Sequence, residues 1–158
     1  MATARVWILK ASEKRGWHWR RFFGSGEGDQ WGGKEWIKSL ASVRHLREGV
    51  RKGNTILAWQ VGDGIVGLCK TARGGYEENK GSGKYDMVDL AASPCLEWTS
   101  TPISIGEMKQ SPVLGRMEAL RMPRGTVFAV TPREWAEIRK LIKDNKLATP
   151  AQLRRFAP

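Results

Sequence analysis

The chain has 158 residues, of which 41% are hydrophobic and 27% are charged, and its formal net charge is +11. This length suits one domain, residues 1–158, with a core of its own, and the composition excludes a disordered or fibrous chain. No segment approaches the roughly 18 consecutive apolar residues of a membrane-spanning helix, and no signal-peptide pattern opens the chain, so we expect a cytoplasmic protein without membrane contact.

The N-terminal part of the chain predicts a strand, a loop and a helix. Arg5 to Lys10 form a short apolar strand. Residues 11–33 are rich in aromatic residues, arginine and glycine but show no helical period, which predicts a loop with one strand around residues 19–23. Between Lys34 and Val50 apolar residues recur every three or four positions, as on one face of an amphipathic helix or of two short helices in line.

The middle of the chain predicts a hairpin followed by a polar loop. Residues 55–61 and 65–71 are typical of two strands, and Gly62-Asp63-Gly64 between them is a strong turn signal. Residues 73–85 are polar and glycine-rich, which predicts a loop with a tyrosine near each end. A strand follows over residues 85–92.

The C-terminal part predicts two strands and two helices. A strand is expected around residues 95–99. Ser104, with Glu107 three residues later, forms a capping box that begins a short helix. Residues 126–130 then predict a strand, and the Thr131-Pro132 pair begins a helix that extends to residue 145.

This order of elements predicts an α+β fold, a small mixed or barrel-like sheet with helices packed around it. Strands do not alternate regularly with long helices, as they do in doubly wound folds. The two cysteines, Cys69 and Cys95, are isolated in the sequence, so we expect buried free thiols.

Catalytic and metal-binding patterns are missing from the sequence. Gly28, Gly33 and Lys34 match the spacing of a phosphate-binding loop, but Glu35 stands where a Ser or Thr hydroxyl would hold magnesium. Neither of the two histidines has a nearby nucleophile, and no Cys or His pair has metal-ligand spacing. We therefore expect no enzyme activity, no metal and no cofactor.

The distribution of charge points to a polyanionic partner. Basic residues outnumber acidic ones by 12 to 5 over residues 1–53 and by 11 to 4 over residues 108–158, whereas the balance over residues 54–107 is 4 to 7. Lysine and arginine near a phosphate backbone gain Coulomb attraction and release counterions. We hypothesise that the two basic ends form one face.

Aromatic residues stand beside these basic residues. The aromatic residues Trp17, Trp19, Phe22 and Phe23 are interleaved with Arg15, Arg20 and Arg21. A flipped or single-stranded base stacks on such rings while arginine holds its phosphates. Trp31 and Trp59 lie next to turns, which favours a pocket. Core positions are instead expected for four other tryptophans, Trp7, Trp36, Trp98 and Trp135.

Four segments of the sequence resemble the EVE domain, a member of the PUA-like superfamily that also includes the YTH domain. They are "VWILK", "WGGKEWIKSLASVRHL", "GNTILAWQVGDGIVGLCKT" and "TPISIGEMKQSPVLGRMEALRMPRGTVFAVTPREWAEI". In the last segment, the order typical of EVE domains is kept by Leu120, Arg124, Thr131, Pro132, Glu134 and Trp135. The resemblance covers about residues 5–142, and residues 146–158 form a C-terminal extension.

The resemblance implies a small PUA-like mixed β-barrel that takes a methylated or hydroxymethylated base into an aromatic pocket. It also implies a place beside modification-dependent restriction systems. Trp31 matches the tryptophan ahead of the first helix, and Trp59-Gln60 matches a Tyr-His pair beside the pocket. The sequence departs from the family at residues 33–35, where Gly-Lys-Glu replaces Val-Arg-Asn, and at Trp59-Gln60 itself.

We therefore hypothesise a non-catalytic reader that flips a modified base out of its stack. The predicted base-binding residues are Trp31, Trp59, Gln60, Tyr76 and Trp19. In this hypothesis the rings stack on the base, and the Gln60 amide, which is both donor and acceptor, reads its edge. Whether Trp59 faces the pocket or the core depends on the strand register. The predicted phosphate contacts are Arg20, Arg21, Arg44 and Arg47.

Two other functions stay open from sequence alone. A PUA-type domain that binds RNA without reading a modification would bind modified and plain strands equally. A regulatory or enzymatic domain would use the pocket for a small molecule. For the main hypothesis, modified DNA is favoured over RNA as the partner, with a nuclease or another effector chain as a further partner.

Overall fold

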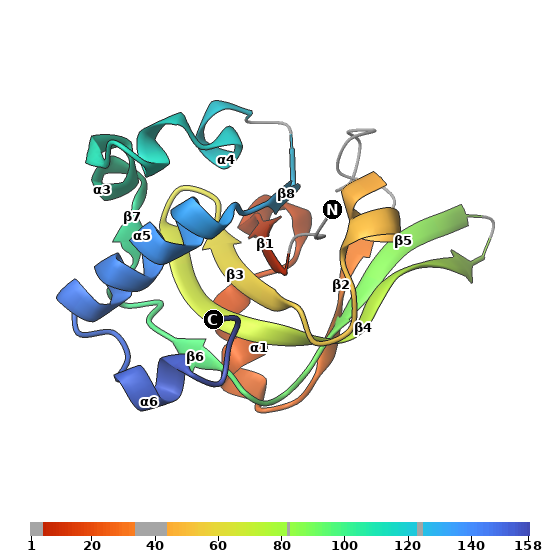
Figure 1. Cartoon of the computed structure of the whole chain (residues 1–158). Helices are drawn as coiled ribbons and strands as arrows, with labels where there is room; N and C mark the ends of the chain where they lie inside the picture. The colour runs from red at the N-terminus through yellow and green to blue at the C-terminus, as the bar shows by residue number, and fades with distance from the viewer. Residues whose placement is uncertain (1–4, 34–43, 82, 123–124) are drawn as a thin grey trace.

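The computed structural model describes residues 5–33, 44–81, 83–122 and 125–158 (Figure 1). The strands are β1 (Val6–Ala11), β2 (Asp29–Gly33), β3 (Thr55–Gln60), β4 (Gly64–Lys80), β5 (Gly83–Leu90), β6 (Leu96–Glu97), β7 (Ile103–Ser104) and β8 (Val127–Ala129). The α-helices are α1 (Trp19–Ser25), α3 (Ile105–Gln110), α4 (Glu118–Arg121), α5 (Pro132–Asp144) and α6 (Pro150–Leu153). Shorter turns of helix are η1 (Glu13–Arg15), η2 (His45–Gly49) and η3 (Leu114–Arg116).

The strands form one mixed sheet in the order β2-β5-β4-β3-β1-β8, and β6 and β7 also pair with β4. β1 and β3 are parallel, and the other pairs are antiparallel. The α+β fold predicted from the sequence is confirmed. Closure into a barrel is not seen in the described part of the chain, because the end strands β2 and β8 do not pair with each other.

The central strands β1 and β3 are buried on both faces, so their alternating side chains feed two separate cores. We call these the helix-side cluster and the arm-side cluster. The helix-side cluster includes Ile8, Leu57, Trp59, Met108, Leu114, Trp135 and Ile138. The arm-side cluster includes Leu9, Trp19, Trp31, Leu46, Ile56, Ala58 and Val88. Every side chain on β3 therefore belongs to one face or the other.

Helix α1 replaces the loop and strand predicted over residues 11–33. The side chain of His18 caps it by accepting a hydrogen bond from the backbone N–H of Arg20, and Gly26 ends it in the left-handed conformation. Trp19 and Phe22, three residues apart, bury one face of the helix. Seven residues are too few for the sequence to show a helical period. β2 then occupies the end of the predicted loop.

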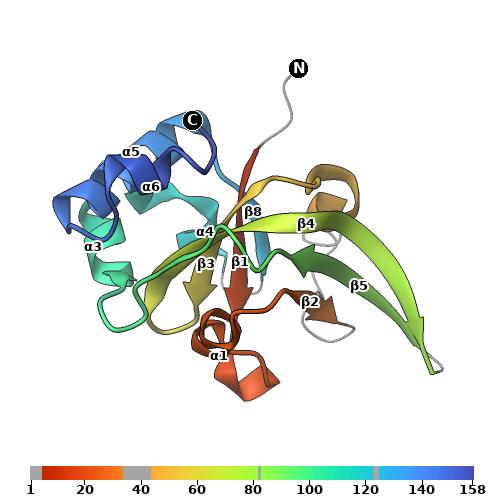
Figure 2. The same ribbon diagram turned by 90° about the horizontal axis from the view of Figure 1, so that it is seen from below.

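The glycine-rich loop predicted over residues 73–85 is also wrong. β4 continues without a break to Lys80 and pairs with β5, so this segment is a long hairpin arm (Figure 2). Two glycines of the arm lie very close to the backbone of the segment before β3. A Cβ atom on Gly74 would lie 2.5 Å from the carbonyl oxygen of Val50, and a Cβ atom on Gly75 would lie 1.7 Å from the carbonyl oxygen of Leu46. Glycine here permits close packing under η2 rather than a turn.

Several other predicted elements are confirmed. β1 matches the first strand, and β3 and β4 form the hairpin around Gly62. Both cysteines are free thiols as expected, but only Cys69 is buried, whereas Cys95 is half-buried. Thr131 and Glu134 form the complete capping box of α5. Most of the helix predicted from Lys34 to Val50 lies outside the described residues, and its last part is the wide turn η2.

The C-terminal residues pack onto the helix-side cluster. Thr149 and Gln152 form a second capping box, which begins α6, and Leu153 and Phe156 bury their side chains in the helix-side cluster. The backbone N–H of Ala157 donates a hydrogen bond to the hydroxyl of Thr55 at the start of β3. Among the described residues, no helix is both long and apolar enough to cross a membrane.

The β2–β5 pair depends on Gly32. Its φ of +136° is rarely adopted by other residues, and an added Cβ would lie 2.1 Å from the carbonyl oxygen of Asp86 on β5. We expect Gly32→Ala to lower the free energy of unfolding by roughly 2–4 kcal/mol, measured by urea denaturation. Gly24→Ala is the control, because a Cβ at Gly24 meets nothing within 4 Å. Equal stability of the two variants would contradict this account of β2.

Candidate nucleic-acid interface

Trp31 is the predicted pocket residue on β2, and its side chain is fully buried in the arm-side cluster. It pairs in register with Val88 of β5, and Gly32 follows it at the close approach to Asp86. Its indole packs in the same cluster as Leu9 of β1 and Ala58 of β3. A base could stack on this ring only if the surrounding side chains moved away from one of its faces.

Gln60 and Trp19 hold helix α1 against the ends of the central strands. The Gln60 side-chain oxygen accepts a hydrogen bond of 3.1 Å from the backbone N–H of Trp19, and its amide nitrogen donates one of 3.2 Å to the carbonyl of Ala11. The Trp19 indole N–H donates to the carbonyl of Trp59 at 3.1 Å. Both ends of the Gln60 amide are thus bonded to backbone, which makes it a structural link here rather than an exposed reader of a base edge.

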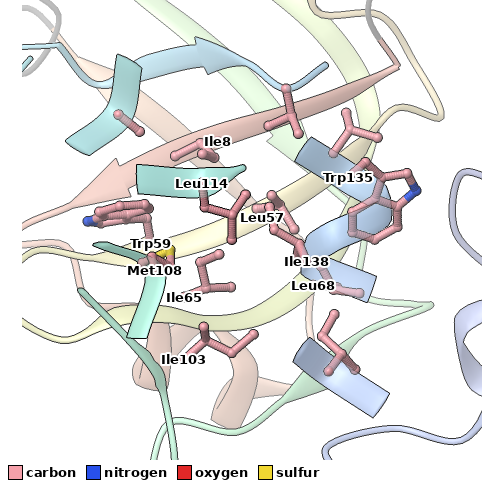
Figure 3. Packing of buried hydrophobic residues seen from close by; sticks show 14 of the residues in the cluster. Ile8, Leu57, Trp59, Ile65, Leu68, Ile103, Met108, Leu114, Trp135 and Ile138 are labelled. Carbon is pink, nitrogen blue, oxygen red and sulfur yellow. The ribbon is translucent and has the colours of Figure 1, made fainter. Parts of the chain in front are cut away.

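Trp59 lies on the other face of β3. Its side chain packs in the helix-side cluster next to Met108, at the opposite end from Trp135 (Figure 3). The sequence left open whether Trp59 faces a pocket or a core. It faces the helix-side cluster, whereas Trp31 lies in the arm-side cluster. The two rings predicted to enclose one base therefore do not face each other in this structure.

Lys10 is the cation that Trp59 contacts. Its ammonium nitrogen lies 4.9 Å from the centre of the Trp59 ring and 5.0 Å from that of Phe128, and it donates a hydrogen bond of 2.5 Å to the carbonyl of Ala119. Only 8% of the residue is exposed. Burial lowers the pKa of Lys10 from 10.5 to about 8, because the charged form loses its hydration.

Tyr76 belongs to a polar network on the outer face of the arm. The amide nitrogen of Gln30 donates to the Tyr76 hydroxyl at 2.6 Å and to a carboxylate oxygen of Glu78 at 2.7 Å, and the Tyr76 hydroxyl donates to Asp89 at 2.5 Å. The Arg73 guanidinium lies 3.7 Å from the centre of the tyrosine ring. Burial, reinforced by the hydrogen bond to Asp89, raises the pKa of Tyr76.

This network separates Tyr76 from Trp31. Gln30 and Trp31 are neighbours on β2, so their side chains point to opposite faces of the sheet, and Tyr76 is bonded to Gln30. Tyr76 is therefore not a third wall of a pocket around Trp31. Beside the network lies a shallow hollow of about 410 Å³, lined by Gly28, Asp29, Gln30, Asp89 and Leu90.

The predicted phosphate-binding arginines divide into two groups. Arg20 and Arg21 are exposed on α1, and Arg44 is exposed at the start of η2. In both views α1 and η2 lie apart, so the four arginines do not form one cluster (Figures 1 and 2). Arg47 forms ion pairs with Glu77 at 2.6 Å and Asp86 at 2.5 Å, and these carboxylates would compete with a phosphate.

Sequence reasoning missed the partners of these residues. Asp89, Glu78 and Gln30 meet because β4 shifts register twice, between Thr71 and Arg73 and again between Arg73 and Tyr76. Such bulges leave no clear signal in a single sequence. Among the described residues no three His, Cys, Asp or Glu side chains gather as a metal site requires.

A family model for the EVE domain matches residues 5–141. The chain belongs to the EVE-domain family. No match was found among curated protein sequences. The EVE fold is also shared with solved structures: protein Atu2648 from Agrobacterium tumefaciens is 24% identical with a TM-score of 0.74, over 98% of this chain and 99% of that one.

Two further EVE-like structures extend the comparison. Rpa0253 from Rhodopseudomonas palustris is 26% identical, with a TM-score of 0.69 over 87% of this chain and 92% of that one. Human THYN1, solved in complex with DNA that contains 5-methylcytosine, is 15% identical, with a TM-score of 0.67 over 86% of this chain and 96% of that one. At this identity, the likeness to THYN1 shows the fold.

Gln60 provides a test of its structural role. Gln60→Leu leaves the Trp19 N–H without its acceptor, while the Ala11 carbonyl keeps its hydrogen bond from the backbone N–H of Val61. We therefore expect the free energy of unfolding to fall by about 1–3 kcal/mol in urea denaturation. Gln110→Leu, at an exposed position on α3, should change it little. A Gln60→Leu variant with unchanged stability and weakened oligonucleotide binding would instead assign Gln60 to base recognition.

The lowered pKa of buried Lys10 should make the stability of the protein depend on pH. Its pKa is about 8 in the folded protein against 10.5 in the unfolded chain, so between these values the unfolded chain binds more protons and stability rises with pH. The rise is expected to total about 3 kcal/mol, and Lys10→Met should abolish it. The measurement is the difference in free energy of unfolding between wild type and Lys10→Met across pH 7–11, in which other titrating groups cancel. A difference that does not change with pH would contradict the buried charge.

Proposed function

We propose that this EVE domain binds nucleic acid containing a modified base and has no catalytic activity of its own. The observation that supports the proposal most is the family match over residues 5–141, together with the structure of THYN1, a protein of the same fold, on DNA containing 5-methylcytosine. Methylated cytosine in DNA is therefore the first ligand to test. The formal net charge of +11 is consistent with a polyanionic ligand.

In this proposal Trp31 is the stacking residue. It is the tryptophan on strand β2, it sits next to the Gly32 close approach, and its ring belongs to the arm-side cluster. Stacking of a base on such a ring contributes roughly 1–3 kcal/mol. Because the ring is fully buried, the base enters only as neighbouring side chains move aside, which makes recognition depend on the local stability of this cluster.

Trp19 and Gln60 support the site without touching the base. Their hydrogen bonds fix α1 to the ends of β1 and β3, and α1 carries the exposed Arg20 and Arg21. These two arginines, with Arg44, are the proposed phosphate contacts. Phosphate contacts set the position of the strand, whereas the pocket reads the modification.

The test compares two buried tryptophans of the same cluster. Trp31→Leu removes the proposed stacking ring, and Trp7→Leu makes the same change at a residue that is 3% exposed and bonded to Asn54. We expect wild type and Trp7→Leu to prefer a 5-methylcytosine duplex over a plain duplex in fluorescence anisotropy, and Trp31→Leu to lose that preference, with a roughly 5- to 100-fold loss of affinity for the modified strand.

Trp31→Phe keeps an aromatic ring and a more nearly native core, so it should retain part of the preference. Folding of each variant is checked by circular dichroism before binding is measured. Equal preference in Trp31→Leu and Trp7→Leu would remove Trp31 from the site. A wild-type protein that binds both duplexes equally would contradict the proposed reading of a modification.

A further inference from the structure

Two grooves run along α5, away from the candidate interface. The first, of about 700 Å³, lies at the N-terminal end of α5 against α3 and η3, and its basic lining residues are Lys109, Arg116 and Arg133. The second, of about 580 Å³, lies between α5 and α6, and its basic lining residues are Arg139, Lys140, Lys143 and Arg154. Helix α5 lines both grooves, so they follow each other along one helix.

The charged lining of the grooves is almost entirely positive. Seven cations line them, and Glu134 is the one acidic residue among their lining residues. Its carboxylate already accepts the backbone N–H of Thr131 in the capping box of α5. None of the seven cations forms an ion pair within the described part of the chain, and six of them are exposed.

The second groove combines this charge with an apolar floor. Ala136, Ala148, Pro150 and Leu153 line it beside the four cations, and no acidic residue lines it. Arg139 is half-buried over the ring of Trp135, which limits its motion. Lys140, Lys143 and Arg154 are exposed, so their charges remain available to a ligand.

The spacing of the cations fits an extended polyanion. Arg133 and Lys143 are ten residues apart on α5, which is about 15 Å along the helix axis. One strand of duplex DNA presents a phosphate every ~3.4 Å of its axis, so this length faces roughly four phosphates. A small anion would need only one of these charges.

In both views α5 and α6 lie on the opposite side of the molecule from the β4–β5 arm (Figures 1 and 2). The arm carries Glu77 and Asp86 beside Arg47 and, on its outer face, Glu78 and Asp89 in the network of Gln30 and Tyr76. Carboxylates therefore lie on both faces of the arm, whereas the grooves present almost only cations. From this we infer that the α5–α6 surface is a second contact for the phosphodiester backbone of nucleic acid, separate from the base site. This inference rests on the proposed function and adds an anchor that does not read sequence or modification.

The test neutralises three exposed cations of the second groove in the 158-residue chain, as Lys140→Ala, Lys143→Ala and Arg154→Ala together. A charge-matched control variant carries Arg5→Ala, Arg51→Ala and Lys52→Ala, three exposed residues that line neither groove. Binding of 5-methylcytosine and plain duplexes of 24 base pairs, about two helical turns, is measured by anisotropy from 50 to 300 mM salt.

We expect the α5–α6 variant to bind both duplexes at least about tenfold more weakly at 100 mM salt, with the ratio of modified to plain affinity unchanged. The slope of log affinity against log salt should become shallower by about 0.9 for each lost contact, hence by about 2.7 for three. The control variant should show a much smaller change in slope.

Equal slopes and affinities in the α5–α6 and control variants would overturn the inference. So would a loss confined to vesicles of anionic phospholipid or to poly-glutamate, used as alternative probes, with duplex binding intact. A shallower slope in a protein that never prefers the modified duplex would support the backbone contact and contradict only the proposed base reading.

Discussion

The parallel pairing of β1 and β3 at the centre of the sheet is the constraint on which the rest of the structure depends. Each residue from Val6 to Ala11 pairs in register with one from Thr55 to Gln60, and both strands are buried throughout. Two cores are therefore built from one pair of strands, and neighbouring residues always belong to different cores. Trp59 and Gln60, adjacent in sequence, therefore have different roles. Trp59 packs in the helix-side cluster, and Gln60 holds α1 by a hydrogen bond from the backbone N–H of Trp19.

Much of the fold follows from local chemistry that a single sequence displays. The Gly62 turn, the Thr131-Pro132 helix start and the apolar β1 were predictable because each depends on a few adjacent residues. Helix α1 and the β4–β5 arm were not, because tertiary contacts override their local signals. Gly74 and Gly75 are typical of a loop in the sequence, but they lie within β4, and glycine is needed there because the backbone of Leu46 and Val50 leaves no room for a Cβ.

The candidate site was harder to predict than the fold because it depends on which face of the sheet each strand residue points to. The family pattern predicts Trp31 as a candidate base-binding residue, but it does not predict that the ring is buried in the arm-side cluster. Trp31, Trp59 and Tyr76, which were expected to enclose one base, lie in three different places: the arm-side cluster, the helix-side cluster and the polar network of the arm. Gln30 and Asp89, which hold Tyr76, are brought together by β-bulges whose positions the alternation of apolar residues does not reveal.

The distance between the carboxylates of the arm and the cations of the grooves has a consequence for the approach of a charged ligand. Strands β4 and β5 together hold four acidic and four basic residues, whereas seven cations and one carboxylate line the grooves along α5. This uneven distribution gives the protein an electric dipole in addition to its net charge. In the field of a polyanion such a dipole experiences a torque, and in the proposed complex this torque would turn α5 and α6 toward the phosphates before contact. Orientation during approach reduces the fraction of unproductive encounters, and added salt weakens it as it screens the field.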